Sequence, residues 1–148
     1  MKEVINPFDL NNEPVSAFTH LIGLVLAIVA MLAMVILAIL EGTGMHFLGF
    51  AVFGTSLVML YTSSFFYHIL PRDTRIKEIS QRIDHAMIFV LIAGSYTPIC
   101  LTIDNRGAGW SLLIAIWLIA IVGIIFKSKG IKIKLELLIS RLSSSSEK

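Results

Sequence analysis

The chain has 148 residues, of which 56% are hydrophobic and 15% are charged, and its formal net charge is +2. This balance excludes an ordinary soluble domain, because such domains carry about 25% charged residues and fewer apolar ones. The basic residues lack the interleaved aromatic residues and the module signatures of nucleic-acid-binding proteins, so membrane lipid, and no nucleic acid, is the expected partner.

Four apolar stretches are each long enough to cross a hydrocarbon core of about 30 Å as a helix. They predict an all-α, polytopic transmembrane bundle of four spans. The predicted helices cover residues 15–40, 46–70, 84–103 and 107–127. The first stretch follows no basic segment and is longer than the apolar part of a signal peptide, so we expect it to remain in the mature protein.

The segments outside these helices differ in charge and predict the topology. Residues 1–14 form a polar N-terminal segment, and its last residue, Pro14, suits the first turn of a helix. All Lys and Arg residues except Arg106 lie in this segment, in the connection 72–82, or in the basic tail 128–148 with the last residue of the helix before it. The positive-inside rule therefore predicts that both termini are cytoplasmic in a multi-pass protein of the cell membrane, the bacterial inner or plasma membrane.

Prolines predict two local features of the second and third helices. Pro71 is expected to end the second helix, and Pro98 is expected to kink or loosen the last turn of the third. Between these helices, Ile76 and Ile79 have the i, i+3 spacing of residues on one side of a helix. We expect the charged connection that contains them to lie on the membrane surface.

Polar side chains near the ends of the spans are the candidates for chemistry, because an Asp at the centre of a membrane helix costs about 2.5–3.5 kcal/mol. Ser64 and His68 share one face of the second helix, since residues i and i+4 are stacked. Asp84 and His85 open the third helix, and His20 lies near the start of the first. In the predicted topology all are at cytoplasmic helix ends. The start of the first helix, His68 and Asp84 can thus converge at one depth. The sequence predicts that Ser64, His68 and Asp84 share a pocket between the second and third helices.

Each candidate also has a simpler interpretation, which the spacing leaves open. His68 fits an interfacial histidine that reaches the headgroups, and Asp84 fits a helix N-cap or first-turn acid. Ser64 fits a hydroxyl bonded to carbonyls of its own helix, and His20 fits packing between helices. Alternatively, an imidazole with a nearby carboxylate fits metal-assisted hydrolysis, in which the metal activates a bound water.

Three ordered motifs carry a resemblance to a known family. They are EPVSAFTHLIG from Glu13, SSFFYH ending at His68, and RIDHAMIFVLIAGSYTP from Arg82. Over about residues 13–126 the chain resembles the haemolysin III family, the bacterial branch of the progestin and adiponectin receptor group. The resemblance implies a seven-helix protein in a proposed superfamily of metal-dependent membrane hydrolases, acting on a lipid-like amide or ester.

The resemblance also implies roles for individual residues. His68, in the pattern Ser-x-x-x-His, is similar to a zinc ligand of the family, and Asp84 is similar to a catalytic carboxylate that orients water. Ser64 is implied to support the catalytic site. The other motif residues are Glu13, Thr19, His20 and His85.

The sequence departs from the family pattern after the fourth helix. The family carries two further metal-binding histidines, spaced His-x-x-x-His, on its last helix, whereas no histidine follows His85 here. We therefore expect an incomplete set of zinc ligands and a chain that matches only the first four family helices. Three functions stay open: a metal-dependent membrane hydrolase or its truncated form, a pore-forming haemolysin that perturbs membranes (cytolysis), and an inactive fragment. Whether another chain, for example in a homo-oligomer, supplies the missing ligands also stays open.

Overall fold

The computed structural model describes residues 14–71 and 74–128, and these residues form helices without any strand. The helices are α1 (Pro14–Glu41), α2 (Gly44–Ile69), α3 (Arg75–Thr102) and α4 (Arg106–Ser128). All four are long and apolar enough to cross a membrane. The predicted fold class, an all-α bundle with four candidate spans, is confirmed for the described part of the chain.

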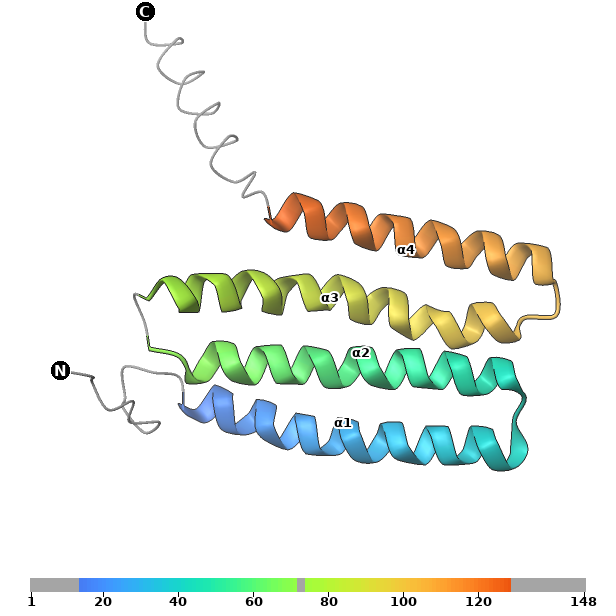
Figure 1. The fold of residues 1–148 in the computed structure, drawn as a ribbon, viewed down its shortest axis with the longest axis horizontal. Coiled ribbons are helices and arrows are strands. Elements are labelled where there is room, and N and C mark those ends of the chain that lie inside the picture. Colours follow the sequence, from blue (N-terminus) through green and yellow to red (C-terminus); the bar gives the residue numbers. More distant parts are fainter. Residues whose placement is uncertain (1–13, 72–73, 129–148) are drawn as a thin grey trace, which may run out of the picture.

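The helices lie antiparallel in a single row, in the order of the sequence (Figure 1). Among the described residues, α1 packs on α2, α2 on α3 and α3 on α4, and the backbones of no other pair of helices come as close. The start of α1, the end of α2, the start of α3 and the end of α4 therefore share one end of the row. We call it the Pro14 end, and we call the opposite end, where α1 connects to α2, the Gly42 end.

The start of α3 differs from the sequence prediction. The apolar pattern placed it at residue 84, but α3 begins at Arg75. Thr74 is the N-cap, and its Oγ1 accepts a hydrogen bond from the backbone N–H of Lys77 at 3.2 Å. Most of the expected charged connection is therefore helical. Asp84 lies well inside the helix, so its interpretation as an N-cap or first-turn acid is wrong.

Close approach of the helices depends on small residues, as is usual in membrane bundles. An added Cβ on Gly49 of α2 would lie 2.6 Å from the Cα of Pro98 on α3. The helix α3 continues through Pro98 to Thr102, so the proline does not end it. Among the described residues no large side chain is fully buried, and many large apolar side chains cover the outside of the row. Such a surface suits helices surrounded by lipid.

Candidate functional site

At the Pro14 end, two histidines and a serine from adjacent helices meet. His20 Nε2 on α1 lies 3.4 Å from Ser64 Oγ on α2. The rings of His20 and His68 are stacked, with centroids 4.9 Å apart and an interplanar angle of 15°. Ser64 is 5% exposed, and both histidines are half-buried. We call this group the His20–Ser64–His68 cluster.

The helical spacing of α2 explains which residues of the cluster face α1. Tyr61, Ser64 and His68 follow one another at i, i+3 and i+7, and the Tyr61 ring centroid lies 6.0 Å from that of His20. Gly23 of α1 has no side chain, which leaves room for the Tyr61 ring. The contacts of the cluster therefore lie between α1 and α2. These contacts join Ser64 and His68 to α1. The pocket that the sequence predicts for them with Asp84, between the second and third helices, stays a prediction.

The Ser64 hydroxyl differs from the other hydroxyls of α2 near it. Those of Thr62 and Ser63 donate to carbonyls of their own helix, at 2.7 Å and 2.8 Å. The Ser64 hydroxyl instead contacts a residue of α1, so its interpretation as an own-helix hydrogen bond does not hold. The second ring nitrogen of His20, Nδ1, is buried and has no hydrogen-bond partner among the described residues. An unpaired polar atom of this kind marks a position that a polar group can satisfy.

Asp84 is level with the cluster but takes part in none of the contacts given above. It is half-buried on α3, between Gln81, which contacts Tyr67 of α2, and Gly94, which faces Ser56 of α2. This antiparallel register places Asp84 at the depth of the stretch of α2 that contains Ser64.

The remaining motif residues are placed as follows. His85 follows Asp84 on α3 and is half-buried. Thr19 is exposed, and its hydroxyl donates to the backbone carbonyl of Ser16 at 2.9 Å. Glu13 lies outside the described residues. The structure thus brings His20, Ser64 and His68 together, and it gives Thr19 a contact within its own helix.

The described residues by themselves do not make up the zinc site that the resemblance implies. Such a site takes three or four ligands at about 2.0–2.3 Å, with their lone pairs directed at one point. Within residues 14–71 and 74–128, no group of three or more His, Cys, Asp or Glu residues is placed to hold a metal. The lone pair of an imidazole nitrogen lies in the plane of its ring. Because the rings of His20 and His68 are nearly parallel, their lone pairs lie in nearly parallel planes and are not directed at one point.

Three residues that the sequence analysis did not single out extend the cluster toward α3. The Tyr67 ring lies beside that of His68, with centroids 4.8 Å apart, and its hydroxyl accepts a hydrogen bond from Gln81 Nε2 at 3.3 Å. Lys77 Nζ lies 4.7 Å from the centre of the Tyr67 ring. Lys77 and Asp84 are at i and i+7, the spacing of one helix face. If the predicted third helix is extended back to Thr74, Lys77 therefore becomes a candidate on the same face as Asp84.

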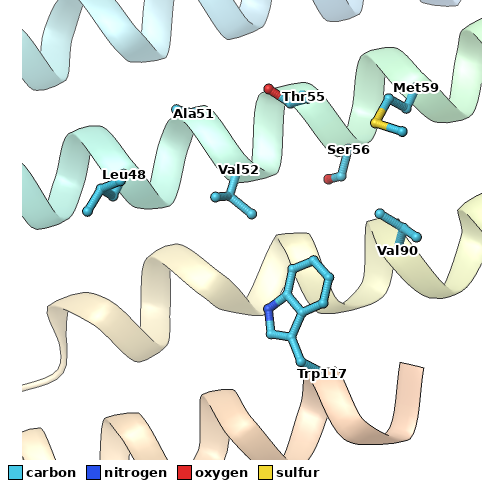
Figure 2. A pocket seen from close by; sticks show the side chains of 8 residues that line it. All are labelled: Leu48, Ala51, Val52, Thr55, Ser56, Met59, Val90 and Trp117. Atoms are coloured by element: carbon cyan, nitrogen blue, oxygen red, sulfur yellow. The ribbon is translucent and has the colours of Figure 1, made fainter. Parts of the chain in front are cut away.

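A separate cavity of about 310 Å³ lies between α2, α3 and α4 and is mostly apolar. Trp117 extends from α4 toward Val52 and Ser56 of α2, which line the cavity (Figure 2). The indole Nε1–H of Trp117 donates to Thr97 Oγ1 on α3 at 3.2 Å. No residue of the His20–Ser64–His68 cluster lines this cavity, so the candidate chemistry is located elsewhere.

Comparison with known proteins gives the following matches. The family model described as Haemolysin-III related matches residues 8–138. A Hemolysin-3 homolog of Bacillus subtilis (strain 168) is 38% identical over 120 residues, which cover 81% of this chain and 56% of the relative. Hemolysin-3 of Bacillus cereus is 38% identical over 118 residues, which cover 80% of this chain and 53% of the relative. The chain thus spans about half the length of the curated relatives it matches, and no solved structure matches it.

Proposed function

Because the chain belongs to the haemolysin-III related family and is a multi-pass membrane protein, we propose that it supplies one part of a membrane-embedded hydrolase site for a lipid-like amide or ester. The observation that carries the proposal is the contact of His20, Ser64 and His68 across α1 and α2. Imidazole and hydroxyl groups held together in a partly buried site can accept and donate the protons that hydrolysis moves. We place the site at the cytoplasmic face of the cell membrane, because the basic segments adjoin the Pro14 end.

The roles proposed for this chain follow from its own contacts. In the tautomer of His20 that carries its ring proton on Nδ1, the Ser64 hydroxyl, 3.4 Å away, can donate to Nε2. Stacking on His68 holds the His20 ring in its plane. Asp84, at the same depth on α3, provides a carboxylate that accepts a proton from water. His68 is the ligand that the chain offers to zinc, and the remaining ligands would come from outside the described residues.

A pore-forming haemolysin is the alternative, since the curated relatives are named hemolysins. A channel needs polar groups along the length of its helices. In this row, the buried hydroxyls of Ser56 and Thr97 donate to the carbonyls of Phe53 and Ala93 on their own helices. Large apolar side chains cover the outside of the described helices. These observations favour a site at one end of the row over a continuous polar path.

Zinc content and hydrolysis of the purified chain test the proposal. We expect weak or substoichiometric zinc binding and low hydrolysis of lipid amides and esters, because three or four ligands make a stable site. Adding a C-terminal segment that carries a His-x-x-x-His helix is expected to raise zinc affinity and activity. This gain is expected to disappear in His68→Ala, and to fall in Ser64→Ala but not in the control Ser63→Ala.

Three results would contradict parts of this proposal. Stoichiometric zinc that survives dialysis against a chelator, and is lost in His68→Ala, would show that the chain's own ligands suffice. Dye release from lipid vesicles without hydrolysis would favour the pore. A supplemented protein that neither binds zinc nor hydrolyses lipid would favour an inactive fragment.

A further inference from the structure

Lys77 is a buried cation at the Pro14 end. The residue is 9% exposed, and its Nζ has no hydrogen-bond partner among the described residues. A buried ammonium group is costly unless it is paired with an anion and hydrogen-bonded. The Tyr67 ring, 4.7 Å from Nζ, offsets only part of this cost, because a cation–π contact replaces few of the interactions that water provides.

The groups around Lys77 suit a compact anion. Lys77 lies in the first turn of α3, where backbone N–H groups point out of the helix and the dipole favours negative charge. Thr74 accepts from the N–H of Lys77 itself, while the N–H groups of Arg75 and Ile76 precede any carbonyl they could reach within the helix. The one acidic residue of this turn, Glu78, is exposed.

The Tyr67 ring, which the Lys77 ammonium group faces, is itself held in place. Gln81 Nε2 donates to its hydroxyl at 3.3 Å, and the His68 ring lies beside it. The position of Nζ is thus defined by α2 and α3 together. A preformed position for a cation lowers the cost of binding an anion there.

We propose that Lys77 binds the phosphate group of an anionic membrane lipid at the Pro14 end of α2 and α3. α2 ends at Ile69 and α3 begins at Arg75, so Lys77 lies near the end of both membrane-crossing helices, at the level expected for headgroups. Lysine binds phosphate as a point charge, and its three N–H donors match the phosphate oxygens. This site is separate from hydrolysis and does not depend on the proposed function.

Native mass spectrometry of the full chain in detergent tests the proposal. The protein is titrated with phosphatidylglycerol, with phosphatidylcholine and with inorganic phosphate, for the wild type and the variants Lys77→Met, Lys77→Arg and Arg75→Met. We expect the wild type and Lys77→Arg to prefer phosphatidylglycerol, and Lys77→Met to bind it roughly tenfold more weakly. Arg75→Met is the matched control, because it removes an exposed charge from the same turn, and we expect its affinity to change by about twofold or less.

Each outcome decides for or against the site. Binding of inorganic phosphate with the same dependence on Lys77 would support the anion site and assign it to soluble phosphate. Equal losses in Lys77→Met and Arg75→Met would overturn the proposal, because they would indicate general surface charge. A wild-type protein that binds phosphatidylcholine as tightly as phosphatidylglycerol would overturn it without any variant, so the test does not depend on the folding of Lys77→Met.

Discussion

Individual hydroxyl groups in these helices have different partners, and the partner determines what each one contributes. Most donate to a carbonyl of their own helix, as Thr102 does to Pro98 at 2.8 Å. Thr97 does the same toward Ala93 and also accepts from the Trp117 indole of α4. Ser64 contacts His20 of α1. Only hydroxyls that contact a neighbouring helix, such as those of Thr97 and Ser64, hold two helices together.

Replacing Thr97 with valine tests the contact with Trp117. Valine keeps the shape but leaves the indole N–H without its acceptor, so we expect Thr97→Val to lower the free energy of unfolding by about 0.5–1.5 kcal/mol. Thr102→Val, which removes a hydroxyl bonded within its own helix, is the control and is expected to change it by less than about 0.5 kcal/mol. Denaturant unfolding in detergent measures both. Equal effects would show that the Trp117 contact adds nothing to stability.

The contact between His20 and Ser64 can be measured by a double-mutant cycle. We expect His20→Ala and Ser64→Ala to couple by about 0.6–1.7 kcal/mol in the free energy of unfolding, as hydrogen bonds between membrane helices do. A parallel cycle of His20→Ala with Ser63→Ala is expected to show no coupling, since Ser63 bonds to Leu60 of its own helix. Coupling of the same size in both cycles would contradict the interhelical contact.

At the scale of one residue, the sequence was informative about faces but not about partners. The i, i+4 spacing correctly indicated that Ser64 and His68 lie on one side of a helix. The common depth indicated that the start of the first helix lies near His68, but the spacing does not say which neighbouring helix that side of α2 meets. The sequence does not indicate Lys77, because a hydropathy pattern assigns a charge next to an apolar run to a loop.

Whole elements were predicted more completely, since the apolar stretches are long and nearly free of charge. The exception is the start of α3, where the first turns carry Arg75, Lys77 and Glu78. A hydropathy pattern marks the part of a helix that lies in lipid, whereas the N-cap at Thr74 determines where the helix itself begins. Nine residues of α3 therefore precede Asp84, the predicted start.

The packing of α2 on α3 predicts the effect of a small substitution. Gly49→Ala would place a methyl group 2.6 Å from the Cα of Pro98, and backbone atoms cannot move aside as a side chain can. We expect a loss of about 1–3 kcal/mol in the free energy of unfolding. Gly44→Ala is the control, because an added Cβ there meets nothing within 4 Å, and its stability is expected to be unchanged or slightly higher.

Thermal unfolding of the two glycine variants in detergent gives the comparison. A melting temperature of Gly49→Ala equal to that of Gly44→Ala would show that α2 and α3 are farther apart than described.

For the whole molecule, the family prediction from three motifs is confirmed by the family match, and the predicted topology stays a prediction. The single row places the start of α1, the end of α2, the start of α3 and the end of α4 at one end, and the connection between α1 and α2 at the other (Figure 1). The order of the helices along the sequence was predictable. Their arrangement in a single row was not predictable, because hydropathy does not indicate which helices are in contact.

Labelling of single cysteines measures the topology. In a Cys100→Ala background, cysteines introduced after Leu10, at Gln81 and at Lys148 are expected to be protected from an impermeant reagent in intact cells, and one at Gly42 is expected to react. The physical reason is the distribution of Lys and Arg, of which only Arg106 lies on the Gly42 side. Labelling at Gln81 from outside would show that the protein has the opposite orientation.

The single row also has a consequence for how the helices pack during synthesis and how they unfold under force. The backbone of each described helix packs closely only against the helices next to it in sequence. During synthesis, a helix that leaves the ribosome therefore finds its docking surface already present on the one before it, and it need not wait for a later helix. Pulling on the C-terminal end of α4 should undo the same steps in reverse, so that force spectroscopy records α4, then α3, then α2 leaving the membrane one at a time.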